Sequence, residues 1–264
     1  MSDSPPPSVT GDPGVRLDRD GPVATVTLCR PHVLNAQTPA MWGELRQIGR
    51  DLPGDVRVVV VRGEGRAFSA GLDLAAVSET AAGSFSFADL ARRDDTEATE
   101  TIARFQEAFS WLRRPDLVSI AAIRGHAIGA GFQLALACDL RVLAEDAQFT
   151  MAEVSLGLVP DLGGTRRLVE LVGYARALDI CLTGRRVGAH EADRLGLATS
   201  VVPSDDLDKT VEDLSTQLLA ARPGAVVEIK ALLSAAALRT FPEQEAAERS
   251  AQLRCLRDLT AQGD

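Results

Sequence analysis

"GHAIGAGFQLALACDLRV", residues 125–142, has glycine-rich residues typical of a turn followed by an apolar run typical of a short helix. A strand-like run, "LVSIAAIRG" (117–125), leads into it, and a further strand-like run, "LRVLAE" (140–145), follows the helix. Strand, helix and strand in direct succession are typical of alternating α/β organisation. The stretch therefore predicts an α/β fold with a turn at Gly129 to Gly131.

The same alternation is visible nearer the N-terminus. "PVATVTLCRP" (22–31) and "VRVVVVRG" (56–63) have the composition of strands, the second of them buried. Between them, "TPAMWGELRQIGRDL" has apolar residues at helical spacing, with Thr38 as N-cap and Pro39 at the first helical position. Strand, helix and strand thus recur along the chain.

Three other parts of the chain depart from this alternation. Residues 75–98 combine Ser, Thr and Gly with clustered charge, which is typical of a surface loop or of a mobile segment over a pocket. Residues 1–13 are polar and proline-rich, and we expect a disordered tail. From about residue 204 onward, successive amphipathic helices follow, whose apolar faces must pack on their own domain or mediate oligomer contacts. The predicted organisation is a core over 14–203 and a helical region over 204–264.

Composition limits the classes of partner. The chain of 264 residues carries a formal net charge of -9, which argues against general nucleic-acid binding. No apolar run is long enough to cross a bilayer, since the most apolar one is broken by Arg124 and His126. The N-terminus lacks the basic and apolar regions of a secretory signal, so we expect a cytoplasmic protein without a membrane partner.

The cysteines and histidines are scattered and indicate no metal site. The cysteines show no CxxC spacing, and we expect them to be reduced, buried small residues: Cys29, Cys138, Cys181 and Cys255. The histidines show no ligand-like clustering either: His32, His126 and His190.

Two glycine-containing loops are candidates for chemistry. "AFSAGLD" (67–73) is not a nucleophile elbow, because Ala67 stands where that motif needs glycine. "GAGFQL" (129–134) is not a dinucleotide loop, because Leu134 replaces its third glycine. What remains is a pair of strand-to-helix junctions whose free N–H groups can converge on one oxygen and form an oxyanion hole. Small residues at such junctions are also common for packing reasons alone.

Five motifs in order resemble one known family. They are "RPHVLNAQ" (30–37), "AFSAGLDL" (67–74), "GHAIGAGFQLALACDLRV" (125–142), "FTMAEVSLGLVPDLGGTRRL" (149–168) and "LTGRRVGAHEADRLGLATSVVP" (182–203). Together they resemble the crotonase, or enoyl-CoA hydratase/isomerase, superfamily over almost the whole chain from about residue 14. The resemblance implies a crotonase-like spiral of repeated β-β-α units with a C-terminal helical trimerisation region. It also implies an acyl-CoA substrate, a homotrimer or dimer of trimers, and no cofactor apart from the coenzyme A that enters with the substrate.

The resemblance assigns binding roles by position. The two oxyanion donors are the backbone N–H groups of Leu72 and Ala130. The resemblance also implies that residues of the "RPxxLNA" segment and of the two loops contact the substrate and its coenzyme A. These residues are Arg30, Val33, Leu34, Ala70, Gly71, Asp73 and Gly129. From the residues alone, Arg30 could equally be a solvated charge at a strand end, and Asp73 could cap or brace its own loop.

The side chains limit the chemistry. A hydratase of the family uses two glutamates, of which Glu153 is present and the other is replaced by Gln133, which cannot transfer a proton at ordinary pH. Asp161 matches a catalytic aspartate of the family's dienoyl-CoA isomerases, or it caps the helix that begins near it. With Glu153 as a single base, the resemblance favours isomerisation over hydration. A non-catalytic acyl-CoA-binding protein and a thioester hydrolase or decarboxylase of the same fold are the alternatives.

Overall fold

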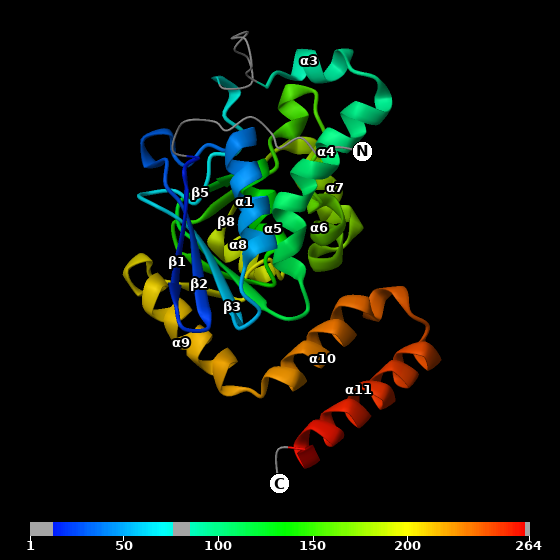
Figure 1. The fold of residues 1–264 in the computed structure, drawn as a ribbon. Coiled ribbons are helices and arrows are strands. Elements are labelled where there is room, and N and C mark those ends of the chain that lie inside the picture. The colour runs from blue at the N-terminus through cyan, green and yellow to red at the C-terminus, as the bar shows by residue number, and fades with distance from the viewer. Residues whose placement is uncertain (1–12, 76–84, 262–264) are drawn as a thin grey trace.

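A computed structural model describes residues 13–75 and 85–261, and two sheets form its centre (Figure 1). The larger sheet has the order β1-β2-β3-β4-β6-β9, antiparallel at β1–β2 and parallel elsewhere. Its strands are β1 (Val15–Asp20), β2 (Val23–Leu28), β3 (Val58–Gly63), β4 (Val118–Ile123), β6 (Leu140–Ala144) and β9 (Ser200–Val202). The smaller sheet consists of β5 (His126–Ile128), β7 (Gln148–Thr150) and β8 (Arg186–Gly188). The predicted strands are therefore present, each a little shorter than its apolar run.

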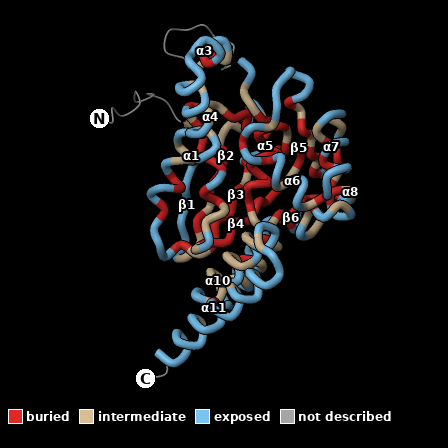
Figure 2. The backbone as a smooth tube through the Cα atoms, turned by 90° about the vertical axis from the view of Figure 1, so that its right-hand side faces the viewer, coloured by how far each residue is buried: buried red, intermediate tan, exposed pale blue. Residues whose placement is uncertain are grey.

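The central strands are apolar on both faces because helices cover both sides of the larger sheet. Along β3, Val59 and Val61 face one core, whereas Val58 and Val60 face the other. The first core includes α1 (Pro39–Asp51) and α5 (Ala130–Ala137), and the second is closed by α9 (Leu207–Ala220). The buried positions in Figure 2 accordingly concentrate in the strands and in α5.

Two helices begin where the sequence predicts them. Thr38 caps α1, and its side chain accepts a hydrogen bond of 3.2 Å from the Met41 N–H. All residues of α5 are buried, which explains why this helix shows no polar face. Between β7 and β9 lie the helices α6 (Gly164–Val172), α7 (Tyr174–Thr183) and α8 (Ala189–Arg194).

The expectation of a loop over residues 75–98 is wrong for its second half. Residues from Phe87 onward form α3 (Phe87–Arg92) and the start of α4 (Asp95–Ser110), whereas residues 76–84 lie outside the described residues. The reason is capping: Ser86 accepts a hydrogen bond from Asp89 N, and Asp94 accepts from the first turn of α4. The polar residues that suggested a loop are thus in part helix caps.

The four cysteines are free, but only Cys138 is fully buried. It ends α5 inside the first core, and burial raises the pKa of its thiol to about 12. Cys29, Cys181 and Cys255 are partly exposed because they lie at element ends and on outer helices, so the prediction that they are buried is wrong. In the part of the chain that the structure describes, no helix is long and apolar enough to span a bilayer.

Among the described residues from 204 to 261, the C-terminal region contains three α-helices, which pack in different ways. Helix α9 packs on the larger sheet through Leu207 and Val211. In contrast, α10 (Pro223–Ala235) and α11 (Phe241–Ala261) pack on each other and extend away from the core (Figures 1 and 2). We call this pair of helices the C-terminal arm.

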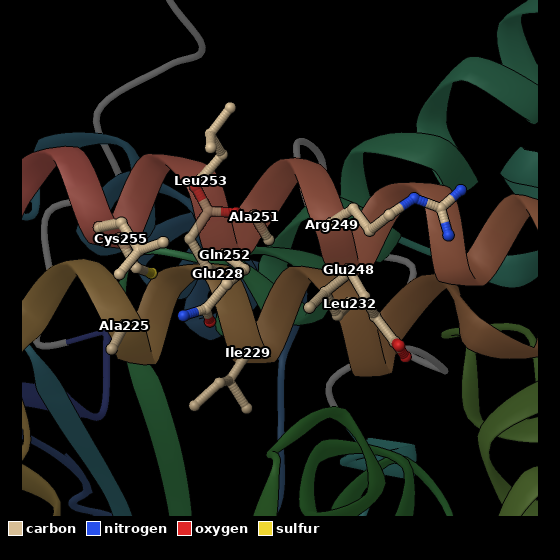
Figure 3. Close-up of a pocket in the computed structure, with 11 residues that line it drawn as sticks. Ala225, Glu228, Ile229, Leu232, Glu248, Arg249, Ala251, Gln252, Leu253 and Cys255 are labelled. Carbon is tan, nitrogen blue, oxygen red and sulfur yellow. The ribbon is translucent and has the colours of Figure 1, made fainter.

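A cavity of about 620 Å³ lies within the arm, between α10 and α11 (Figure 3). Its walls are mainly aliphatic, with Leu232, Ala251 and Leu256 among the lining residues. Ile229 and Leu253, whose side chains point to opposite sides of the helix pair, are 56% and 50% exposed. The prediction that further copies of the chain cover these faces in a trimer stays a prediction.

One buried ion pair fastens the arm to the core. The Lys230 ammonium of α10 is 10% exposed and donates to Asp139 Oδ2 at 2.7 Å and to the Leu117 carbonyl at 2.6 Å. Asp139 also accepts a hydrogen bond of 2.8 Å from Ser119 N at the start of β4. The origin of the arm is thus tied to two neighbouring strands of the larger sheet.

Replacing this lysine is expected to destabilise the protein. Lys230→Met leaves a largely buried carboxylate without its cation and is expected to cost roughly 3 kcal/mol in the free energy of unfolding, measured by urea denaturation. The matched control is Lys209→Met, which removes the 73% exposed partner of Asp213 and is expected to leave the free energy of unfolding nearly unchanged. Equal effects of the two substitutions would contradict the role assigned to Lys230.

Candidate active site

One pocket of about 650 Å³ collects most of the predicted site residues. The predicted residues that line it are Ala70, Gly71, Leu72, Gly129, Ala130, Gln133, Glu153 and Asp161. The predicted residues Arg30, Val33, Leu34 and Asp73 are not among its lining residues. Segments far apart in sequence therefore meet at this pocket, which has a polar end and an apolar end.

The first wall is the junction around Gly71 and Leu72. A parallel bridge joins Leu72 to Gln37, in which Gln37 N donates to Gly71 O at 2.6 Å and Asp73 N donates to Gln37 O at 2.8 Å. In such a bridge the middle residue's own N–H points to the opposite side. The Leu72 amide therefore faces away from Gln37, on the side of the pocket that Leu72 lines.

The second wall is the junction at Gly129 and Ala130. Gly129 has φ 50° and ψ −117°, a conformation that glycine adopts readily, and α5 begins at the next residue. The Ala130 N–H precedes the hydrogen-bond ladder of α5, so it is available to a ligand, and the helix dipole increases its positive potential. The alanine methyl group is accommodated, since Ala130 is only 5% exposed.

The two junctions are in direct contact. A Cβ atom added to Gly71 would lie 2.4 Å from the Ile128 carbonyl oxygen and 3.5 Å from Ala130 N. A Cβ atom added to Gly131 would lie 2.5 Å from the Ser69 carbonyl oxygen. Glycine at these positions is what allows the two main chains to approach, and Leu72 and Ala130 from the two junctions line the same pocket.

The carboxylate of Glu153 lies beside the second junction. Glu153 is 9% exposed at the start of a 3₁₀ turn, and a Cβ atom on Gly129 would lie 3.3 Å from its Oε1. Its Oε1 accepts a hydrogen bond of 2.7 Å from Gln133 Nε2, whereas its buried Oε2 has no partner among the described residues. Burial raises the pKa of the carboxyl, and the Asp161 charge adds to the rise, although the hydrogen bond from Gln133 opposes it. Glu153 thus has the features of a general base.

Asp161 lies at the pocket wall and does not cap a helix. The helix that follows, α6, has Gly163 as its N-cap without a side-chain cap, so the capping alternative is wrong. Asp161 is exposed to solvent, but partial desolvation of its carboxyl at the pocket wall raises its pKa. A second carboxyl with a raised pKa therefore borders the same pocket as Glu153.

Arg30 braces the loops outside the pocket. Its Nη1 donates to the Ala36 carbonyl at 2.6 Å and to Asp73 Oδ2 at 2.9 Å, and its side chain is only 24% exposed. The alternative of a solvated charge at a strand end is therefore wrong, whereas Asp73 does brace its own loop. Contact of Arg30, Val33 or Leu34 with coenzyme A stays a prediction.

The far end of the pocket is an apolar wall, and part of it comes from residues 75–98, which the sequence placed, as one alternative, over a pocket but did not predict to be helical. It is formed by α3, α4 and the turn after Glu153, with Phe87, Leu90, Ala91, Ala98, Ile102, Phe105, Leu156, Leu158 and Val159 among its residues. The sequence does contain a pattern that predicts these helices. Apolar residues at the spacing of one helix face occur in each of them, at Phe87, Leu90 and Ala91 in α3 and at Ala98, Ile102 and Phe105 in α4. The two ends of the pocket together suit a molecule with a polar carbonyl group and an apolar tail.

Comparison with known proteins agrees with this geometry. The enoyl-CoA hydratase/isomerase family profile matches residues 18–262, so the chain belongs to that family, within the crotonase superfamily. The "Probable enoyl-CoA hydratase echA8" of Mycobacterium tuberculosis is 35% identical over 195 residues, which cover 73% of this chain and 70% of the relative. The "Carnitinyl-CoA dehydratase" of Salmonella typhi is 37% identical over 224 residues, which cover 84% of this chain and 80% of the relative.

Solved structures show the same fold. A "putative enoyl-CoA hydratase" from Thermobifida fusca YX in complex with acetoacetyl-CoA is 49% identical, with a TM-score of 0.88, covering 93% of this chain and 96% of that one. A structure of a "putative enoyl-CoA hydratase" from the same organism in complex with CoA has a TM-score of 0.89 and 48% identity, covering 94% and 95% of the two chains. The predicted crotonase-like α/β fold is thereby confirmed.

The contact between the two junctions can be tested by adding one methyl group. Gly71→Ala, at φ 85°, combines a strained backbone with a collision against the Ile128 carbonyl, and is expected to cost about 3 to 4 kcal/mol in urea unfolding. The matched control is Gly21→Ala, at φ 53° with nothing within 4 Å, where only the backbone strain of about 1 kcal/mol remains. A Gly71 variant no less stable than the Gly21 variant would show that the junctions are not in close contact.

Proposed function

We propose that this protein isomerises an enoyl-CoA thioester through an enolate, with Glu153 as the base. One observation carries the proposal: an unpartnered carboxylate oxygen of Glu153 is buried in the same pocket as the amides of Leu72 and Ala130. A base and two N–H donors at one site are what is needed to form an enolate and to stabilise it.

The reaction uses these groups in order. Glu153 Oε2 takes a proton from C2 of a 3-enoyl thioester, and the electron pair of that C–H bond moves toward the thioester oxygen. The amides of Leu72 and Ala130 donate to the resulting oxyanion, a stabilisation of roughly 3 to 4 kcal/mol for each well-placed donor. Glu153 then returns the proton to C4, so the double bond moves from C3–C4 to C2–C3. No atom is gained or lost, and one base is sufficient.

Hydration needs an additional proton-transferring group, which Gln133 does not supply. Both sides of the Gln133 amide are already engaged, because its Nε2 donates to Glu153 and its Oε1 accepts from Leu162 N at 2.8 Å. An amide neither accepts nor releases a proton at ordinary pH. The proposed activity is therefore isomerisation or related enolate chemistry, and Asp161 is its second candidate proton carrier.

A pair of substrates tests the reaction type. Purified protein is expected to convert a 3-enoyl-CoA to the 2-enoyl-CoA and to hydrate crotonyl-CoA only slowly, as measured by absorbance of the conjugated thioester and by chromatography. Glu153→Gln is expected to lower turnover by about 10² to 10⁴-fold with substrate binding retained. Crotonyl-CoA hydration at the rate of an ordinary hydratase would contradict the proposal. Binding without turnover would favour an acyl-CoA-binding protein, and release of free CoA a hydrolase or decarboxylase.

The raised pKa of Glu153 predicts the pH dependence of the reaction. Only the ionised carboxylate accepts a proton, so kcat/KM is expected to fall as the pH drops through the pKa of Glu153. Because burial raises that pKa, the midpoint of this acid limb is expected above the ordinary glutamate value of 4.5. A pH profile of kcat/KM measures it directly. A midpoint at or below the ordinary value would contradict the assignment of Glu153 as the buried base.

A further inference from the structure

We propose that Gln133 is a positioning residue for the carboxylate of Glu153. Its side chain donates a hydrogen bond to one of the two carboxylate oxygens, and it connects this carboxylate to the loop that carries Asp161. The expected effect of Gln133 on the reaction rate rests on the proposed function, whereas its positioning of Glu153 does not. A glutamine where the family's hydratases have a second acid is thereby given a role of its own.

The donor side of the Gln133 amide selects the reactive oxygen of Glu153. Gln133 is 1% exposed, and its Nε2 lies 2.7 Å from Glu153 Oε1. The other oxygen, Oε2, is buried and has no hydrogen-bond partner among the described residues. Since Oε1 is engaged, Oε2 is the atom left to meet a substrate proton.

The acceptor side of the amide fixes its orientation. Gln133 Oε1 accepts from Leu162 N at 2.8 Å and lies 3.3 Å from Gly164 N, its second donor. A rotated amide would set its NH₂ group against two N–H donors and its oxygen against a carboxylate, which is unfavourable on both sides. The orientation is therefore determined by the surroundings, and the group that faces Glu153 is always a donor.

Close packing keeps this arrangement rigid. Gln133 extends from the fully buried helix α5, and a Cβ atom on Gly164 would lie only 2.7 Å from Gln133 Cγ. The glycine at the start of α6 thus makes room for the glutamine side chain. Asp161, one residue before Leu162, is held at the pocket wall by the same hydrogen bonds. Gln106 gives this loop a second support, because its Nε2 donates to the Asp161 carbonyl at 2.7 Å without touching Glu153.

The charges around Glu153 give the direction of the effect. Asp161 lines the same pocket and its charge acts on Glu153, and Cys181 of α7 is a further titratable group that interacts with Glu153. Burial and the Asp161 charge raise the pKa of Glu153, and the hydrogen bond from Gln133 lowers it. Without the amide donor, the carboxylate is expected to ionise at higher pH and to lose its fixed orientation.

Gln133→Met removes both hydrogen bonds with little change in volume, and Gln106→Met is the matched control at the other support of the loop. Two curves are measured. The first is the pH dependence of deuterium exchange at C2 of an acyl-CoA. The second is the ¹³C NMR titration of Glu153 in protein labelled at glutamate, in which the Glu153 signal is assigned by its loss in Glu153→Gln. Gln133→Met is expected to shift both curves to higher pH and to lower exchange at neutral pH by about 100-fold. Gln106→Met is expected to leave the midpoint of both curves unchanged.

Gln133→Glu provides a second test if the methionine variant does not fold. It keeps an acceptor for the Leu162 and Gly164 amides but sets a carboxylate against Glu153, so the titration of the pair is expected to move to higher pH. A titration of Glu153 that is the same in wild type and Gln133 variants would overturn the positioning role. Absence of C2 exchange in the wild type, with the NMR shift still present, would overturn the proposed function and leave the positioning role intact.

Discussion

The close approach of two strand-to-helix junctions is the constraint on which the site depends. Gly71 lies against the Ile128 carbonyl with no room for a side chain, and Gly131 lies in the same way against Ser69. Backbone amides have fixed directions, so in the proposed oxyanion hole the Leu72 and Ala130 donors need no adjustment at the moment of reaction. The first junction follows β3 of the larger sheet, and the second follows β5 of the smaller sheet, so both sheets position the two junctions. The fold is thus the means of aligning two N–H groups.

The chemistry depends on what stands beside this pair of amides. A single glutamate, desolvated and bonded through one oxygen, is suited to carrying one proton over a short distance. Gln133 stands where a second acid would form a pair with Glu153. Its amide instead forms hydrogen bonds with Glu153 and Leu162, which hold the site in place. The far wall, formed by α3 and α4, adds an apolar surface for the remainder of the substrate. This combination supports the proposed enolate chemistry on an acyl thioester.

Local patterns predicted the alternating α/β organisation and the two junctions, whereas the resemblance to the family implied the crotonase-like fold and the roles of the site residues. Alternating strands and helices, glycines at the junctions, and Glu153 after an apolar strand are all visible in the residues themselves. The helices of the apolar wall were not predicted because their cap residues, Ser86 and Asp94, are also typical of loops. Whether such a residue caps a helix depends on backbone geometry. The bracing role of Arg30 and the two-sided engagement of Gln133 were also not predictable, since they depend on partners 43 and 20 residues away. Long-range contacts of this kind are set by tertiary packing.

The most direct measurement is a crystal structure of the Glu153→Gln variant with a bound 3-enoyl-CoA. The account predicts that the thioester oxygen lies about 2.7 to 3.1 Å from both Leu72 N and Ala130 N. It also predicts that C2 faces the side-chain position of residue 153 that corresponds to the free oxygen, with the acyl tail against α3 and α4. A thioester whose oxygen is turned away from either amide, or whose C2 lies out of reach of residue 153, would contradict it.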